Sequence, residues 1–227
     1  MFLKAYEDKK YAEDILEGKL YCNTIDFFKK AEAKEDNECR NDSLEGCAFL
    51  LNKKESAYLT TTIDGKEEIL AEIRDLKIFN QNLNFKKIFC VYSFLEECQK
   101  DYFLIDEKFL SMGKYFLLIF YPDEFIERIH KTLKEKEYTF EYNFVEYVDS
   151  TKFSGKWEYF KKDKKYEYQK EFRIYFESKE KDAEILNIGN ISDIAMVCSK
   201  KEFLNMKIGN DFSDNRVEIK NLVNNTR

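Results

Sequence analysis

This 227-residue sequence has one proline, one histidine and no long apolar run. Its longest apolar segment, at 115–121, is far shorter than the ~20 apolar residues that a membrane-spanning helix needs. The first ten residues contain acidic and basic side chains and no apolar stretch of the kind found in signal peptides. The sequence therefore predicts a protein that does not enter the membrane and stays in the cytoplasm.

Several common catalytic motifs are also missing. There is no G-x-G-x-x-G, no Walker-type phosphate loop, no H-E-x-x-H and no G-x-S-x-G, which leaves the commonest nucleotide, zinc and serine-hydrolase functions without support. The six cysteines form no C-x-x-C pair, and a single histidine cannot complete a Cys/His cluster. We therefore expect reduced thiols and no metal site.

The charge balance is acidic, with 38 basic and 44 acidic residues giving a net charge of −6. Non-specific nucleic-acid binding needs a basic footprint, so we expect no nucleic-acid partner except through a local basic loop. Because 44% of the residues are hydrophobic, the chain can bury a core. We expect a single domain over 1–227, with a frayed tail at 220–227.

Local patterns predict an α+β fold with mixed, mostly antiparallel sheets and a few flanking helices. Gly18 is expected to end the first helix, Asp64-Gly65 to form a hairpin turn, and Pro122 to open a helix. The predicted helices cover 9–17, 25–28 and 122–133, with a short one from Ser199. The predicted strands cover 2–6, 20–22, 47–51, 56–62, 67–73, 87–93, 115–121, 138–147, 166–176, 184–188 and 194–198.

The most regular arrangement of polar residues lies on the predicted strand 166–176. Gln169, Glu171 and Arg173 recur at a spacing of two and so share one face, opposite an aromatic face. A fixed carboxylate beside an amide can bind a ribose hydroxyl or stabilise a developing cation, as ADP-ribosyl transfer requires. The alternative is a solvated or ion-paired strand face without catalytic function.

Two loops hold further candidates. The segment 31–46 is strongly polar, and within it we select four residues as possible ligand-binding groups: Arg40, Asn41, Asp42 and Glu45. The alternative is a turn in which Asn41 or Asp42 bonds its own backbone. The predicted loop 151–165 combines aromatic and basic side chains that could anchor a protein partner, namely Trp157, Tyr159, Lys161, Lys162, Lys164 and Lys165.

Five segments together resemble a bacterial and phage protein family of unknown function. They are the Gly18-Lys19-Leu20-Tyr21-Cys22-Asn23 turn, Asn41-Asp42-Ser43-Leu44-Glu45-Gly46, Cys90-Val91-Tyr92-Ser93, Gly113-Lys114-Tyr115 and Tyr166-Glu167-Tyr168-Gln169-Lys170-Glu171-Phe172-Arg173. The opening and the late Gln-x-Glu are also similar to the ADP-ribosyltransferase layout. These resemblances imply a mobile-element origin and a role in conflict between phage and host.

The resemblances leave two main functions open. In an NAD-handling enzyme, Glu171 would be the catalytic acid assisted by Gln169, Arg40 or Arg173 would engage phosphate, and Tyr21 and Asn23 would border the pocket. In an inert binding protein, the chain would grip and inhibit a host protein such as a nuclease. A third possibility is that the polar strand face only holds the sheet together.

Overall fold

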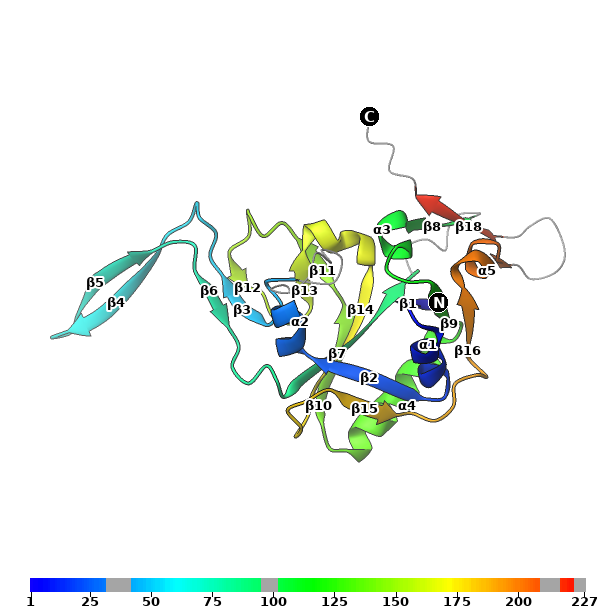
Figure 1. Ribbon diagram of the computed structural model, residues 1–227. Coiled ribbons are helices and arrows are strands. Elements are labelled where there is room, and N and C mark those ends of the chain that lie inside the picture. Colours follow the sequence, from blue (N-terminus) through cyan, green and yellow to red (C-terminus); the bar gives the residue numbers. More distant parts are fainter. Residues whose placement is uncertain (32–41, 95–101, 209–216, 223–227) are drawn as a thin grey trace.

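The computed structural model describes residues 1–31, 42–94, 102–208 and 217–222. Its fold is α+β, as predicted, with mostly antiparallel sheets and a few helices (Figure 1). None of the helices in these residues is long and apolar enough to cross a membrane.

The central feature is an eight-stranded sheet. Its main path runs through β10 (Thr139–Phe144), β14 (Glu171–Glu177), β7 (Lys86–Ser93), β1 (Phe2–Tyr6), β9 (Tyr115–Ile119) and β16 (Ala195–Ser199). A branch from β7 adds β2 (Lys19–Thr24) and then β15 (Glu184–Asn187). All of these neighbours pair antiparallel. Strand β14 carries two residues of the site described below, Glu171 and Arg173.

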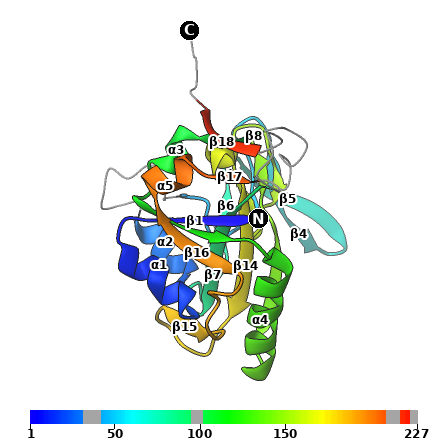
Figure 2. The ribbon, with the colours of Figure 1, turned by 90° about the vertical axis from the view of Figure 1, so that its right-hand side faces the viewer.

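The helices cover the two faces of this sheet. They are α1 (Lys9–Leu16), α2 (Ile25–Ala31), α3 (Glu107–Leu110), α4 (Pro122–Glu135) and α5 (Lys200–Leu204). Helix α4 opens at Pro122 as predicted and buries Phe125, Ile129 and Leu133 in the main core. Helices α3 and α5 pack over the opposite face around Phe109 and Phe203. Figure 2 shows these two helices at the end of the body opposite α4.

Smaller sheets form the rest of the body. One contains β3 (Cys47–Leu50), β6 (Lys77–Phe79) and β12 (Gly155–Lys156), and a parallel pair joins β11 (Glu146–Val148) to β13 (Lys161–Asp163). Another contains β8 (Tyr102–Asp106), β17 (Lys207–Ile208) and β18 (Val217–Leu222). Residues 220–222 therefore end a paired strand, contrary to the frayed tail expected from 220, and residues 223–227 lie outside the described part.

The predicted strand 166–176 is partly wrong. Residues Lys164–Gln169 form a 3₁₀ helix (η2), and β14 begins only at Glu171. Between them Lys170 has φ of 40°, in the left-handed region that breaks a strand. On β14 itself Phe172, Ile174 and Phe176 enter the main core, which confirms the expected aromatic and aliphatic face.

Two strands leave the body as an isolated hairpin, which we call the arm (residues 57–73). Strand β4 (Ala57–Ile63) pairs only with β5 (Lys66–Ile73) in the described part of the chain, and Figure 1 shows the pair projecting from one end of the body. Asp64 and Gly65 have φ of 49° and 74°, as the predicted two-residue turn requires. The hairpin prediction is confirmed.

Two glycines that the sequence singled out allow close backbone approaches. Gly18 follows α1 with φ of +90°, and a Cβ there would lie 2.0 Å from the carbonyl oxygen of Gly189. A Cβ on Gly113 would lie 2.5 Å from the backbone nitrogen of Tyr6. Any larger residue would push β15 from α1 or β9 from β1, so glycine is required for packing at both places.

Candidate functional site

The second face of β14 carries a buried group of charged side chains, which we call the ionic cluster: Glu45, Lys162, Gln169, Glu171 and Arg173. These residues come from the turn before β3, from β13, from η2 and from β14. Four of them, all but Glu171, are at most 5% exposed, and the Glu171 side chain is only 11% exposed. The polar face of the strand is therefore covered by protein.

Arg173 is the centre of the cluster. Its Nη1 and Nη2 donate to Oε1 and Oε2 of Glu45 at 2.7 and 3.1 Å, a bidentate pair across 128 positions of sequence. Nη2 also donates to Oε2 of Glu171 at 2.9 Å, and Nη1 to the backbone carbonyl of Tyr159 at 2.6 Å. The planar guanidinium can hold two carboxylates at once, which an ammonium group could not do with this geometry.

Lys162 completes the cluster from the other side of Glu171. Its Nζ donates to Oε1 of Glu171 at 2.8 Å and to Oε1 of Gln169 at 2.6 Å. Gln169 is thus not on the same strand as Glu171, yet one ammonium group brings their side chains together. Both carboxylate oxygens of Glu171 are consequently bound to cations within the protein.

Glu171 and Lys162 both carry their charges at neutral pH. Burial alone would raise the pKa of Glu171, but Lys162 and Arg173 overcome this effect and lower it to about 2. Burial likewise opposes the charge of Lys162, whereas Glu171 raises the pKa of the ammonium group above its ordinary value. Two cations and two carboxylates therefore balance, the condition under which buried charges are tolerated.

Asp42 lies beside this cluster without a cation of its own. Its Oδ1 accepts the backbone N–H of Leu44 at 3.0 Å, the turn that the sequence offered as an alternative to ligand binding. The side chain is 3% exposed, and its Oδ2 accepts no hydrogen bond in the described part of the chain. Burial, and then the nearby charge of Glu45, raise the pKa of Asp42 to about 6.

Asp42 also lines a cleft of about 440 Å³. The cleft brings the turn 42–44 against the start of η2, where Lys165 belongs to the predicted basic run. Three more lysines line it, Lys53 and Lys54 before the arm and Lys77 after it. No sequence pattern selected these three, although a lysine pair directly before a hairpin is visible in the sequence. Arg40 and Asn41 lie outside the described residues.

The predicted partner loop does not present its aromatic residues. Trp157 is fully buried against Leu44, Cys47 and Leu50, so its proposed role as an exposed anchor is wrong. Tyr159 stacks on Tyr175 with ring centroids 4.3 Å apart, and its hydroxyl accepts from Nζ of Lys86. These rings fill space between layers of the body.

The lysines of this loop divide into two kinds. Lys162 is buried in the ionic cluster, which corrects its expected place on a partner surface. Lys161 is partly buried and pairs with Glu146 at 3.2 Å, whereas Lys164 and Lys165 are exposed. A periodic pattern would not separate them, because β13 is only three residues long.

Tyr21 and Asn23 lie on β2, away from the cluster's hydrogen bonds. Tyr21 is 57% exposed opposite Ile185, and the Asn23 side chain accepts the backbone N–H of Thr24. Neither residue hydrogen-bonds to the ionic cluster or lines the cleft in the described part of the chain. The structure therefore does not bring them together with Glu171.

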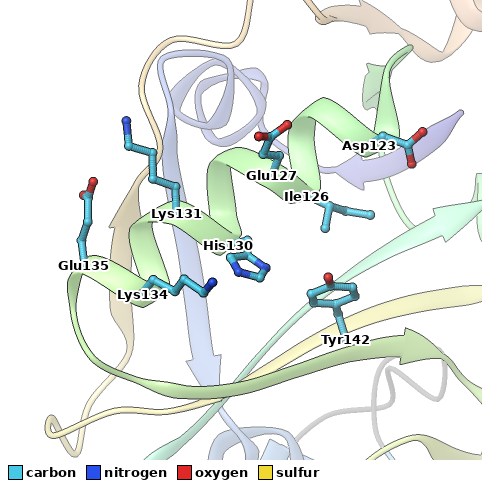
Figure 3. A pocket seen from close by; sticks show the side chains of 8 residues that line it. All are labelled: Asp123, Ile126, Glu127, His130, Lys131, Lys134, Glu135 and Tyr142. Carbon is cyan, nitrogen blue, oxygen red and sulfur yellow. The ribbon is translucent and has the colours of Figure 1, made fainter.

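A second hollow is an open groove of about 740 Å³ beside α4. Figure 3 shows His130 pointing from the helix toward Tyr142 on β10. The imidazole packs edge-on against Phe140 with ring centroids 4.9 Å apart. No carboxylate orients it among the residues described here, so the groove lacks the partner that a histidine base needs.

Metal and thiol chemistry receive no positive support from the described residues. They contain no group of three or more His, Cys, Asp or Glu side chains arranged for a metal ion. Cys22, Cys47, Cys90 and Cys198 are free, and burial raises the pKa of Cys90 to about 12. Buried thiols of this kind are poor nucleophiles at neutral pH.

Comparisons with protein-family models, with curated proteins and with solved structures find no match for this chain. The phage-family resemblance and the ADP-ribosyltransferase resemblance therefore stay predictions.

Proposed function

We propose that this protein acts by binding another protein through the arm, rather than by chemistry at Glu171. The observation that carries the proposal is the set of exposed apolar side chains on the arm. Leu59 and Ile63 are 51% and 50% exposed, and the cross-strand register places them on one face with Ala57, Ala71 and Ile73. The same face also carries Thr61, opposite Glu68, and Lys66, opposite Ile63.

An isolated two-stranded hairpin gains little stability from its own contacts. An apolar strand with a free edge is also an aggregation hazard, which proteins usually avoid with charge or proline at the edge. Strand β4 contains neither, since its sequence is Ala-Tyr-Leu-Thr-Thr-Thr-Ile. These features are unfavourable in a free monomer and favourable in a strand that pairs with a partner.

The charges of the arm indicate the chemistry of the partner. Strand β5 carries Glu67 and Glu68 near its apolar residues, whereas Glu72 is already paired with Arg74 at 2.6 Å. A matching surface offers a strand edge with apolar side chains, bordered by lysine or arginine. In the phage–host setting that the resemblance implies, this partner is a host protein, and a nuclease with a basic surface fits the description.

The geometry of Glu171 gives less support to the NAD-handling alternative. A carboxylate that orients a ribose must face a cleft and have a free oxygen. Lys162 and Arg173 hold both oxygens of Glu171, and this residue lines neither the cleft nor the groove. A structural role for the cluster fits these contacts better.

The test compares three immobilised proteins in host lysate: wild type, the arm variant Leu59→Ser/Ile63→Ser, and a matched body control. The control is Tyr21→Ser/Ile185→Ser, because these two side chains are similarly exposed, at 57% and 49%, and form a cross-strand pair on the body. We expect one stoichiometric protein on the wild type and on the control, but not on the arm variant. Equal capture by all three would refute the role of the arm.

Two further measurements separate the alternatives. Chromatography of NAD incubated with wild type and Glu171→Gln, with and without lysate, is expected to show no loss of NAD. Loss with the wild type alone would establish the enzyme instead. Light scattering of the purified protein is expected to give a monomer, and a dimer abolished by the arm variant would make a second copy the partner.

A further inference from the structure

The groove beside α4 follows an open edge of the central sheet. Strand β10 pairs only with β14 in the described part of the chain, so its other side has no neighbouring strand there. The N–H of Val145 donates to the carbonyl of Glu171 at 2.9 Å and continues the β10–β14 ladder. Because successive residues of an antiparallel strand direct their backbone groups to opposite sides, those of Phe140 and Tyr142 point to the open edge. A further strand can pair with them.

The side chains at this edge are apolar. Phe140, Tyr142 and Phe144 alternate along β10 and share one face, and Tyr142 borders the groove in Figure 3. Tyr142 and Phe144 are 42% and 45% exposed. The polar residues Glu141 and Asn143 belong to the opposite face of the strand. A strand added at this edge would therefore cover aromatic rings that the body leaves half exposed.

The charges along the groove are sorted by their position on α4. Asp123 and Glu127 line its first half, and Lys131 and Lys134 line its second half. All four are exposed, and none of them forms an ion pair within the described residues. Glu135 also belongs to the lining, but its carboxylate points away from β10 in Figure 3. The groove therefore has an acidic end and a basic end.

Helix α4 and strand β10 run side by side in opposite directions, as Figure 3 shows. His130 of α4 packs against Phe140 and Tyr142, with ring centroids 4.9 and 6.4 Å apart. Asp123 and Lys134 lie on either side of this contact along the helix. A second copy related by a twofold axis at Tyr142 would pair its β10 antiparallel with the first. The same rotation brings Asp123 of each copy to the Lys134 end of the other.

The sequence of β10 suits such a pairing in one register. With Tyr142 opposite the same residue of the second copy, Phe140 faces Phe144. In that register Glu141 faces Asn143, so no like charges meet. A shift of two residues in one direction would put Glu141 opposite its own copy, and a shift in the other direction would put Phe140 opposite Glu146.

We propose that the groove and the open edge of β10 bind a second copy of this chain and form a twofold dimer. The β10 strands join the two central sheets, and the acidic end of each α4 faces the basic end of the other. This surface is separate from the arm. The dimer presents two arms, so that a partner with two binding sites is held more tightly than by one copy.

Sedimentation velocity of the full chain tests the dimer. One strand pair and one stripe of a helix form a small interface, for which we expect a Kd of about 100 μM. The protein is then a monomer at the low micromolar concentrations of light scattering and mainly a dimer at about 1 mM. The arm variant Leu59→Ser/Ile63→Ser should associate like the wild type, so this test and the capture test of the arm can fail independently. A protein that stays monomeric at the highest concentration overturns the inference.

An exchange of charges tests the arrangement of the helices. Asp123→Lys and Lys134→Asp are each expected to weaken association about tenfold, because like charges then face each other twice in the dimer. An equal mixture of the two variants should associate at least as tightly as the wild type, since each altered residue then meets an opposite charge. Glu68→Lys makes the same change in net charge as Asp123→Lys on the exposed arm and should have no effect. A mixture no tighter than its components overturns the proposed arrangement.

Tyr142→Glu tests the strand pairing. It places two carboxylates opposite each other at the centre of the dimer and should abolish association, with little change in melting temperature because Tyr142 is partly exposed. Tyr21→Glu is the control, since Tyr21 is 57% exposed on β2, and it should associate normally. Dimers of Tyr142→Glu would overturn the pairing at β10. A lysate protein captured by the arm variant but not by Tyr142→Glu would assign the edge to a foreign strand and also overturn it.

Discussion

The ionic cluster and the arm reverse the usual distribution of residues. In the cluster, Arg173 is 1% exposed with its charge balanced by carboxylates, whereas on the arm Leu59 is 51% exposed with no cover. Both come from strands with the same alternating pattern. The pattern says which side chains share a face, but not which face the rest of the chain covers.

The difference follows from what lies next to each strand. β14 is an inner strand between β10 and β7, and the body adds β13, η2 and the turn at 42–45 over its polar face. The arm has only its own two strands. A buried ion pair is costly to break because the charge that remains has no partner. Substitution of an exposed apolar residue, by contrast, changes the free energy of unfolding little. The two regions should therefore respond very differently to substitution.

The largest effect is expected from Arg173→Met. It leaves Glu45 and Glu171 without their shared cation in a buried place, which costs about 3–5 kcal/mol in the free energy of unfolding. Urea unfolding measures this. The control is Arg128→Met, since Arg128 binds Glu124 and Asp193 at the surface, and a much smaller loss is expected there. Equal losses would mean that burial does not distinguish the two arginines.

The next effect is that of Glu171→Gln, and it depends on pH. The pKa of Glu171 in the folded protein, about 2, is below its ordinary value of 4.5. Its contribution, about 3 kcal/mol from this gap, is therefore present above about pH 5 and is lost as the pH falls toward 2. Unfolding of wild type and variant should differ at pH 7 and converge near pH 2. A difference in the free energy of unfolding that stays constant with pH would contradict an ionised Glu171 in the cluster.

The features that the sequence predicted correctly are local ones. Local signals placed the Asp64-Gly65 turn, the Pro122 helix and the helix that begins after Ser199, where the capping box is present. Each depends on residues within a few positions of one another. The arm was therefore predictable as a hairpin, although its projection from the body was not.

The candidate site was predictable in its residues and not in its contacts. Glu45, Gln169, Glu171 and Arg173 were all selected, but the Glu45–Arg173 pair joins positions 128 apart and leaves no local trace. The left-handed Lys170 that removes Gln169 from the strand also has no sequence signal, because such a conformation is rare for lysine. Trp157 was wrongly expected to be exposed, because in an irregular segment no repeating pattern of apolar residues shows which side chains are buried.

A smaller effect with the opposite sign is expected from Asp42→Asn. The pKa of Asp42 is raised to about 6, so the folded state favours the protonated carboxyl, and wild-type stability from this group is lost as the pH rises through about 4 to 6. Near pH 7 the variant should be more stable by about 3 kcal/mol. The advantage should disappear below about pH 4, and unfolding at both pH values checks it. A variant that is less stable at pH 7 would contradict an uncompensated charge.

The smallest effect on the fold is expected from the arm. Leu59→Ser/Ile63→Ser changes two side chains that are about half exposed in the free protein, so the free energy of unfolding of the body should change by less than about 0.5 kcal/mol. Ile174→Ser serves as the contrast, because Ile174 is 2% exposed and its loss should cost several times more. If the arm variant were as unstable as the core variant, the arm would be packed on the body in solution. A stable, monomeric arm variant that has lost partner capture would instead show that Leu59 and Ile63 serve partner binding and not folding.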